Sequence, residues 1–427
     1  MAGKPRGPGP MKVAVLGAGV VGVTTAYYLS RLGCEVTVVD RQAQVAAETS
    51  FANGGQLSVS HAEPWANPRA PRKILAWLLH GESPIRWCPS ADPQLWWWGL
   101  RFLRECLPGR TRHNVRQLVN LGLYSRAALQ ALRAETGLRY QQRACGILHI
   151  YTHAGEFEAA VEAARVMTAL GCERRILGPD EAVRIEPALR NIRDRLCGAT
   201  YTPGDESGDA QIFTRELAQR CAAAGVRFLM NHRITALHAD GGRVAHAELI
   251  DDEGRFQRLQ ADAYVLALGS HSAGIARRLG LRLPIQPAKG YSLTLPVASA
   301  EAAYETALID DEHKIVFSRL GDRLRVAGMA EVGNWSRALD PARCALLLRR
   351  AQELFPGAGD VTQASYWCGL RPATPSNLPC IGRSHLRGLF LNTGHGTLGW
   401  THACGSGQAV ADIICGRKPE ADFDFRL

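Results

Sequence analysis

Three glycines near the start of the chain constrain its fold more than any other feature. Gly17, Gly19 and Gly22 directly follow an apolar run at residues 12–16 and open a helical pattern that stops at Gly33. In this context the spacing is typical of a dinucleotide-binding βαβ unit. Gly17 permits the tight turn, Gly19 lets the backbone approach a pyrophosphate, and Gly22 lets helix and strand pack closely. The sequence therefore predicts an α/β fold with a Rossmann-type unit at its beginning.

An acidic residue narrows the choice of dinucleotide. Asp40 follows directly on the second predicted strand, residues 35–39. A carboxylate there accepts hydrogen bonds from ribose hydroxyls and disfavours a 2′-phosphate, while the helix N-terminus faces the phosphates. The pattern predicts FAD or NAD rather than NADP. It does not separate the first two, because both contain the ADP half that the fingerprint binds.

Composition and charge exclude several other classes of protein. The chain has 427 residues, of which 46% are hydrophobic and 21% charged, as in globular proteins of two or three domains. Fifty Lys and Arg against forty Asp and Glu give a net charge of +10, but no long run of like charges occurs. We therefore expect no nucleic-acid partner.

Cysteine usage and hydropathy bear on the compartment. The twelve cysteines are scattered, with no CxxC pair and no Cys/His spacing typical of zinc, so we expect free thiols in a reducing compartment and no metal site. Residues 1–10 lack the apolar stretch of a signal peptide, and no run of about 18 apolar residues occurs anywhere. We expect a cytoplasmic protein in which residues 1–10 are a disordered lead.

Periodicity and turn residues predict the remaining elements. The alternation of strand and helix typical of the opening returns after residue 210, and three short alternating segments then predict an antiparallel meander. In chain order we expect an irregular loop at 48–71, helices within 73–104 and 114–136, a strand at 146–151, a helix at 155–170, a strand at 199–201, an acidic glycine loop at 203–209, a helix at 211–224, a buried strand at 226–230, the meander at 233–238, 244–250 and 255–260, a strand at 264–268, a strand-rich region at 285–365, a strand at 388–392, a glycine loop at 393–400 and a helix at 401–415.

Four motifs together resemble the D-amino acid oxidase superfamily of FAD-dependent flavoproteins. They are the glycine fingerprint with Asp40, the loop at 49–56, the turn Gly369-Leu370-Arg371-Pro372, and the segment at 394–401. Within the superfamily, the runs at 48–56, 289–292 and 392–400 are similar to the bacterial D-amino acid dehydrogenases. The resemblance extends over nearly the whole chain, from residue 11 to residue 417.

The resemblance implies a fold and a cofactor. It implies a Rossmann-type FAD-binding domain built from residues 11–62, 208–283 and 366–427, and an α+β substrate domain with an antiparallel sheet built from residues 63–207 and 284–365. It also implies that FAD is held noncovalently. The expected cofactor-binding residues are Gly17, Gly19, Val20, Val21, Gly22, Asp40, Arg41, Thr49, Ser50, Asn53, Gly54, Gln56, Ile234, Ala267, Gly269, Gly394, Thr397, Leu398, Gly399, Trp400 and Thr401.

The resemblance also implies a reaction. A D-amino acid would lose a hydride from its α-carbon to flavin N5, and water would hydrolyse the resulting imino acid to a 2-oxo acid and ammonia. The electrons would pass to a quinone or another respiratory acceptor, with the protein on the cytoplasmic face of the inner membrane. Residues 96–103, with three consecutive tryptophans among them, suit either an interfacial amphipathic helix or a buried helix of the substrate domain.

Three residues are candidates for the reacting centre. Arg371 is expected to clamp the substrate carboxylate with its planar fork. Tyr291 either supplies a second hydrogen bond to that carboxylate or is an ordinary packed strand tyrosine. His395 either hydrogen-bonds near the flavin or braces its glycine loop. His61 is interpreted as a solvated loop histidine, and no general base is required if the substrate binds as the free amine.

Other functions remain open at this point. Within the same superfamily, a glycine- or sarcosine-type oxidase and a D-hydroxyproline dehydrogenase fit the same motifs. From other classes, a noncatalytic dinucleotide-binding protein or a basic RNA-contacting protein would carry no redox activity. Reduction of the flavin by a substrate would distinguish the enzymes from the noncatalytic and the RNA-contacting protein.

Overall fold

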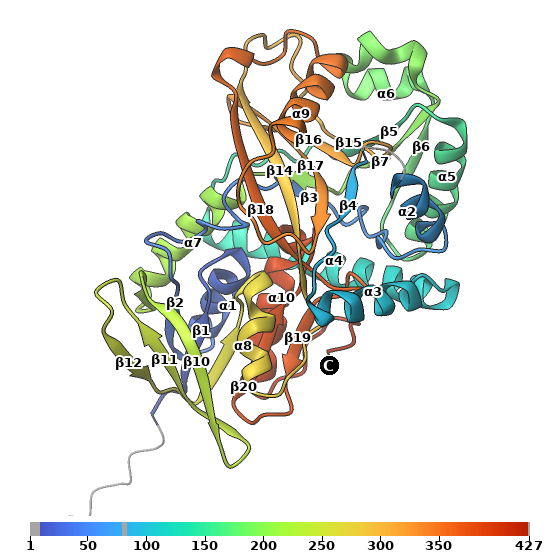
Figure 1. Cartoon of the computed structure of the whole chain (residues 1–427). Helices are drawn as coiled ribbons and strands as arrows, with labels where there is room; N and C mark the ends of the chain where they lie inside the picture. The colour runs from blue at the N-terminus through green and yellow to red at the C-terminus, as the bar shows by residue number, and fades with distance from the viewer. Residues whose placement is uncertain (1–8, 79–82, 426–427) are drawn as a thin grey trace, which may run out of the picture.

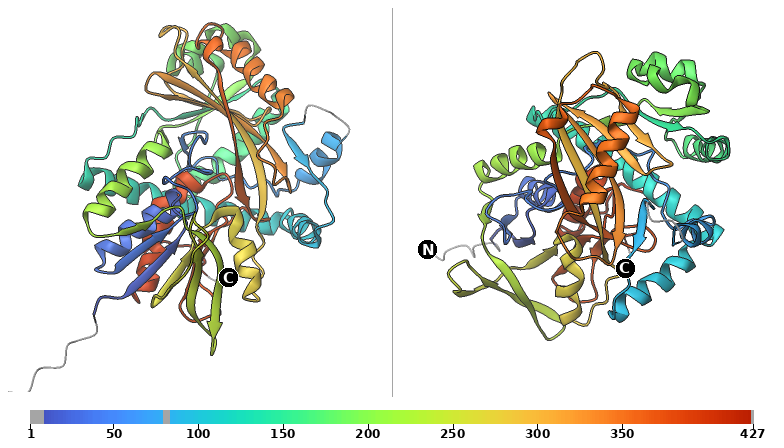
Figure 2. Two further views of the ribbon diagram at one scale, coloured as in Figure 1. Left: turned by 60° about the vertical axis from the view of Figure 1, so that its left-hand side comes forward. Right: turned by 45° about the horizontal axis from the view of Figure 1, so that its top comes forward.

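Two large β-sheets lie at opposite ends of the molecule (Figures 1 and 2). The structure, a computed structural model, describes residues 9–78 and 83–425. A six-stranded sheet with a three-stranded meander forms one end, and a nine-stranded sheet with a covering helix forms the other. The architecture is the α/β fold that the sequence predicts, but the second sheet, which was expected to be antiparallel, is mixed.

The six-stranded sheet contains the dinucleotide-binding unit. Five of its strands are parallel, and only the edge strand β19 runs against its neighbour. The central strands are buried on both faces, which is why they read as continuous apolar runs rather than alternating ones. In spatial order the strands are β19 (Cys380–Arg383), β20 (Leu389–Thr393), β13 (Ala263–Leu266), β1 (Lys12–Leu16), β2 (Glu35–Val39) and β9 (Arg227–Leu229).

Long helices cover one face of this sheet. They are α1 (Val20–Arg31), α4 (Pro108–Thr136), α7 (Ala210–Ala223) and α10 (Gly399–Ile414), and α10 packs against both α1 and α4. Two glycines of α10 allow this packing. A Cβ atom at Gly405 would lie 2.7 Å from the Ser125 Cα, and one at Gly407 would lie 3.0 Å from the Thr24 backbone. Their helix-propensity cost is therefore offset by close contact between helices.

The meander covers the opposite face of the sheet. Its strands are β10 (Arg233–Asp240), β11 (Arg243–Ile250) and β12 (Phe256–Leu259), and the short helix α8 (Ser272–Arg278) lies beside β10. Alternate residues of β1, such as Ala14 and Leu16, pack on this side, while Val13 and Val15 face the long helices. The sheet is thus a layer between two cores.

The nine-stranded sheet is mostly antiparallel. Only the pairs β15–β5 and β17–β4 are parallel. Helix α9 (Pro341–Leu354) packs on β14 and β17. In spatial order the strands are β18 (Ser365–Ala373), β14 (Gln286–Pro296), β17 (Arg323–Val332), β16 (Ile315–Leu320), β15 (Ala307–Asp310), β5 (Ile147–Tyr151), β7 (Gly198–Thr202) and β6 (Arg175–Leu177), with β4 (Ile85–Trp87) beside β17.

The remaining elements connect the two sheets. A two-residue ladder joins β3 (Gln56–Leu57) to β8 (Glu206–Ser207), and 3-10 helices occur at Pro187–Arg195, Gly269–His271 and Val361–Gln363. The other helices are α2 (Ala70–Leu78), α3 (Pro93–Glu105), α5 (Ala154–Ala169) and α6 (Pro179–Ile185). Within the described residues, no helix is both long and apolar enough to cross a membrane.

Four details differ from the sequence-based expectation. Strand β18 pairs with β14 in the nine-stranded sheet, so it does not lie with the FAD-binding segments that were placed from residue 366 onward. Helix α9 interrupts the region that was expected to be strand-rich. Strand β9 is half-buried because it is an edge strand. Helix α4, expected in the substrate domain, contributes Leu121 and Leu129 to the core around α1 and α10.

Candidate active site

One large cavity lies between the two sheets. Its volume is about 1850 Å³, and its walls come from the carboxyl ends of β1 and β2, the loop before β3, the segment before α10, and the nine-stranded sheet. Single-ligand pockets usually measure several hundred Å³, so this volume is sufficient for a dinucleotide and a second small molecule. The carboxyl ends of parallel strands are where doubly wound sheets bind their ligands.

The glycine fingerprint has the geometry that its spacing predicts. Gly17 turns the chain from β1 into α1 with a φ of 116°, and a Cβ atom there would lie 2.5 Å from the Ala267 carbonyl oxygen. A Cβ atom at Gly22 would lie 1.9 Å from the Gly17 carbonyl oxygen. Gly22 is absent from the cavity wall, which Gly17 and Gly19 line. Its role is therefore the close packing of α1 on β1, as predicted.

Asp40 lies at the end of β2 and lines the same cavity. Its carboxylate accepts hydrogen bonds from the backbone N–H groups of Ala18 (2.7 Å) and Gln42 (2.9 Å). Burial raises the pKa of this carboxyl group, and the two N–H groups act in the opposite direction. Its remaining lone pairs suit ribose hydroxyls. The neighbouring Arg41 is ion-paired with Glu48 at 2.6 Å.

The loop before β3 is held against both ends of the molecule. The Ser50 hydroxyl accepts a hydrogen bond from the Val20 N–H at the start of α1 (3.1 Å), and the Gln56 side chain donates to the Leu308 carbonyl of β15 (2.9 Å). Sequence analysis missed a third residue that fixes this loop. Arg325 on β17 donates a hydrogen bond from its guanidinium to the Asn53 carbonyl (2.8 Å). No local signal marks it, because it lies far from the loop in the sequence.

The segment before α10 completes the cofactor end of the cavity. Thr401, in the first turn of α10, accepts a hydrogen bond at its hydroxyl from the Ser58 N–H (3.0 Å). Trp400 packs against Phe213, with ring centroids 4.7 Å apart, and its indole N–H donates to the Gly208 carbonyl. The other expected cofactor residues that line the cavity are Val20, Val21, Thr49, Asn53, Gly54, Ile234, Ala267, Gly269, Gly394, Thr397, Leu398 and Gly399.

Arg371 reaches the cavity from the nine-stranded sheet. It belongs to strand β18 and not to a turn, because residues 365–373 pair continuously with β14. Its Nη1 donates to the Met329 carbonyl (2.7 Å), and the bare backbone of Gly290 makes room for it, since a Cβ atom there would lie 2.0 Å from Nη1. Among the described residues, no carboxylate pairs with this guanidinium.

The charge on Arg371 is therefore uncompensated. Burial lowers the pKa of its guanidinium to about 10, and no other group contributes to the shift. A desolvated cation without a partner is costly for the fold, and an anionic ligand that pairs with it recovers that cost. The hydroxyls of Thr49 and Ser270 donate to the Leu370 carbonyl at 2.9 and 3.0 Å and fix the strand beside Arg371. The arrangement suits a carboxylate.

The structure does not support a substrate contact for the Tyr291 hydroxyl. In the ladder, Arg371 pairs with Ala288 and Tyr291 pairs with Cys368, so the two side chains leave the sheet on opposite faces. The Tyr291 hydroxyl donates instead to Glu331 (3.1 Å) and is buried. That bond and burial raise the pKa of the phenol. Of its two interpretations, the packed strand tyrosine fits.

His395 is buried beside the start of α10 and also lines the cavity. Its Nε2 lies 3.1 Å from the Ser406 hydroxyl. Burial lowers the pKa of the ring to about 3, so the imidazole is neutral at physiological pH. His395 thus braces the loop against α10 while its ring remains uncharged.

A second polar group on the cavity wall was missed by sequence analysis. His61, interpreted above as a solvated loop residue, lies on the wall with His149 and Asp311. Burial lowers the pKa of His61 to about 4 and also lowers that of His149. The Lys314 ammonium and the hydrogen bond with His149 hold the pKa of Asp311 well below its usual range against the effect of burial. The three residues come from separate elements, so no motif links them.

Comparison with known proteins decides the family. The model of the FAD-dependent oxidoreductase family (DAO) matches residues 12–413. The chain belongs to this family. D-amino acid dehydrogenases from Dechloromonas aromatica and Paramagnetospirillum magneticum are 53% and 52% identical to it over 415 and 416 residues. These alignments cover 97% of this chain in both cases, and 99% and 97% of the two relatives.

Solved structures agree with the fold. A glycine oxidase from Geobacillus kaustophilus superimposes with a TM-score of 0.75 at 23% identity, and the match covers 98% of both chains. An L-proline dehydrogenase from P. horikoshii gives 0.75 at 16% identity, covering 97% of this chain and 96% of that one. The family match and the curated relatives show that the protein is an FAD-dependent oxidoreductase. The glycine cradle at Gly17, the Asp40 carboxylate and the cavity volume fit FAD.

Proposed function

We propose that the protein is a D-amino acid dehydrogenase. The observation that carries the proposal is Arg371, a desolvated guanidinium without a carboxylate partner among the described residues, in the same cavity as the dinucleotide fingerprint. The names of the relatives at 53% and 52% identity support it. The substrate is a D-amino acid, and the products are a 2-oxo acid and ammonia.

Different parts of the chain bind the substrate and stabilise the charge that develops in the proposed reaction. Arg371 binds the substrate carboxylate through its planar fork, and the Met329 carbonyl fixes the orientation of that fork. FAD, when bound, supplies the acceptor for the hydride that leaves the α-carbon. The N-terminus of α10 places the positive end of a helix at the cofactor side of the cavity, where it stabilises negative charge. Water then hydrolyses the imino acid.

The proton on the substrate amine predicts a pH dependence. Hydride loss requires the free amine, whose fraction rises tenfold with each pH unit below the pKa of the substrate ammonium group. His61 and His395, with pKa values of about 4 and 3, are neutral above pH 5, so neither changes the slope of the pH profile of kcat/KM. We expect kcat/KM for D-alanine, measured with a soluble acceptor, to rise with a slope of one from pH 6 to pH 8.

Two controls make that measurement decisive. His395→Gln should leave the slope unchanged, and L-alanine should give no turnover at any pH. A break near pH 6.5 that disappears in His395→Gln would contradict the assignment of a neutral histidine. Turnover of glycine or sarcosine in place of D-alanine would move the chain to the oxidase branch of the family.

We also propose that the electrons leave to a quinone at a membrane surface. Helix α3 buries Leu95, Trp98 and Phe102 but exposes Trp96 and Leu100, so both interpretations of this segment apply to different faces of one helix. The exposed fractions are 54% for Trp96, 69% for Leu100, 52% for Leu103 and 57% for Leu107. Arg101 stacks on Trp97 at 4.6 Å. Apolar and cationic side chains together suit an anionic lipid surface.

The cavity reaches the same helix, where Trp96, Leu100 and Leu103 contribute to its wall. We expect the double substitution Leu100→Ser and Leu103→Ser to weaken binding to phosphatidylglycerol-containing vesicles by about tenfold or more, because each leucine loses apolar area that the lipid would bury. Turnover with a water-soluble acceptor should persist. Phe256→Ser, at an exposed apolar residue of β12, is the matched control. Unchanged vesicle sedimentation of the double variant would contradict the membrane proposal.

A further inference from the structure

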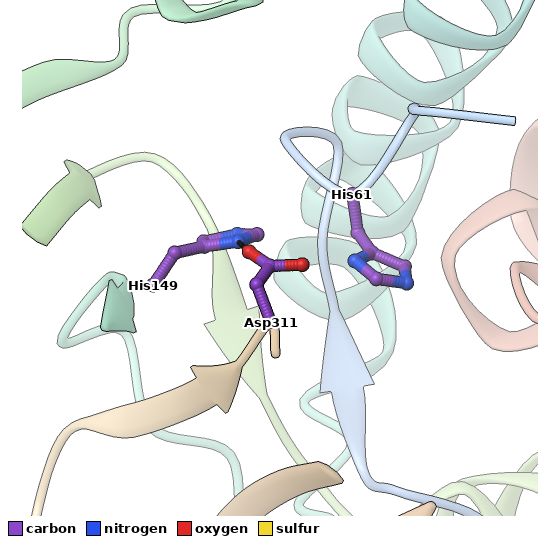
Figure 3. A group of neighbouring side chains, drawn as sticks. All are labelled: His61, His149 and Asp311. Atoms are coloured by element: carbon purple, nitrogen blue, oxygen red, sulfur yellow. Dashed lines mark hydrogen bonds and ion pairs between the residues drawn. The ribbon is translucent and has the colours of Figure 1, made fainter. Parts of the chain in front are cut away.

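Three side chains that the proposed reaction does not use meet on the cavity wall. His61 follows β3, His149 belongs to β5, and Asp311 follows β15. Figure 3 shows the Asp311 carboxylate between the two imidazole rings. One potential ligand atom from each residue lies within 4.8 Å of the others. Two imidazoles and a carboxylate that face an open cavity form a typical donor set for a metal ion.

The Asp311 carboxylate orients His149. The Nδ1 of His149 lies 2.6 Å from Oδ2 of Asp311, and the Tyr151 hydroxyl donates to the same oxygen at 2.9 Å. The opposite ring nitrogen, Nε2, is 3.3 Å from the Ser60 hydroxyl. That hydroxyl lies closer to Asp205, at 2.7 Å. For one metal to bind both His149 and Asp311, the ligand atom of His149 has to be Nδ1, which faces the carboxylate, and the imidazole proton then lies on Nε2 toward the Ser60 hydroxyl.

His61 has a free imidazole. Its backbone N–H donates to the Ser58 hydroxyl (3.2 Å), but within residues 9–78 and 83–425 no hydrogen bond to the ring nitrogens is present. The ring centroid lies 6.1 Å from that of His149.

A cation already approaches this group. The Lys314 ammonium lies 3.1 Å from Oδ1 of Asp311, and its side chain is 40% exposed. It balances the Asp311 charge while the site is without metal. Because Lys314 has a long, flexible and partly exposed side chain, a divalent ion can displace it into solvent. Lys314 therefore competes with the metal for Asp311 but is not itself a ligand. Its replacement by a neutral residue should strengthen metal binding at this site.

The geometry points to a binding site for one divalent transition metal of the Zn²⁺ class, held by His61, His149 and Asp311. Nitrogen ligands favour Zn²⁺, Co²⁺ and Ni²⁺ over Mg²⁺ and Ca²⁺, which prefer oxygen. Bonds of about 2.1 Å in a tetrahedron place ligand atoms about 3.4 Å apart, so the 2.6 Å contact between His149 and Asp311 has to lengthen and the His61 ring has to approach them. The fourth position opens to the cavity. A metal there narrows the cavity and inhibits turnover.

Metal titration of the holoenzyme tests the site directly. The FAD-loaded protein, freed of metal with a chelator, is titrated with Co²⁺, and bound cobalt is followed by its visible difference spectrum and by equilibrium dialysis with Zn²⁺ as competitor. We expect one equivalent with nitrogen and oxygen ligation. His61→Gln and His149→Gln should each weaken binding at least tenfold, and Lys314→Met should strengthen it several-fold.

The controls separate this site from other metal-binding groups. His238 and His246 stack at 4.5 Å on the meander, and their replacement by glutamine should leave the titration unchanged. Because no described residue hydrogen-bonds to the His61 ring, His61→Gln should fold normally even if His149→Gln does not. Binding that survives His61→Gln, a thiolate absorption band from cysteine ligation, or weaker binding by Lys314→Met would overturn the proposal. These readouts do not depend on which amino acid is oxidised.

Discussion

Replacing Arg371 with methionine is expected to lower kcat/KM for D-alanine by a factor on the order of 10² to 10³, with FAD still bound. Methionine retains much of the apolar volume but removes the charge and the fork that we assign to the substrate carboxylate. Loss of one partner from a desolvated charged pair costs several kcal/mol, which corresponds to that factor. Arg371→Lys keeps the charge without the fork, so we expect an intermediate loss.

A second variant displaces Arg371 without altering it. In Gly290→Ala the new Cβ atom would lie 2.0 Å from Nη1, so the guanidinium has to move. We expect a loss in kcat/KM similar to that of Arg371→Met. Gly155→Ala in α5, where no atom lies within 4 Å of the added carbon, is the matched control and should behave as wild type. Wild-type kcat/KM in both Arg371→Met and Gly290→Ala would contradict the assignment.

The variant Gly22→Ala is expected to be purified largely without flavin. Its Cβ atom would lie 1.9 Å from the Gly17 carbonyl oxygen, so α1 would have to move away from β1 and carry its N-terminus away from the pyrophosphate. We expect FAD affinity to fall by about 100-fold or more, and the unfolding free energy to fall by about 1–3 kcal/mol from overpacking. The ratio of flavin to protein absorbance and the Tm measure the two effects.

The control for this variant is Gly109→Ala, another glycine to alanine change in a helix. Gly109 lies in the first turn of α4, and nothing lies within 4 Å of an added Cβ atom. It should bind FAD normally and have an equal or slightly higher Tm, because alanine favours helix. Normal FAD content in Gly22→Ala would contradict the role of close helix packing in the cofactor site.

The cofactor end was predictable because its signals are local. Gly17, Gly19 and Gly22 lie within six residues of one another, at the turn from β1 into α1. Their spacing alone therefore indicates a tight turn followed by close packing of helix and strand. Gly17 and Gly22 leave no room for a side chain because of backbone atoms within this unit and beside it, so a single sequence is enough to interpret them.

The substrate end was less predictable because it depends on register. Arg371 was identified from its motif but was expected in a turn, whereas it lies in β18. Tyr291 contributes to the cavity wall, but its hydroxyl donates to Glu331, and the bulge between Lys289 and Tyr291 is invisible in the sequence. His61 was expected to be a solvated loop residue and not part of the cavity wall, because its neighbours there, such as Asp311, are distant in the sequence.

The most direct test of the central claim is the visible spectrum of the purified protein under anaerobic conditions, before and after addition of D-alanine. We predict that the flavin absorbance bleaches with D-alanine and D-proline and does not change with L-alanine. The Arg371→Met protein should show the same starting spectrum and bleach far more slowly. A yellow protein whose flavin no D-amino acid reduces would contradict the account.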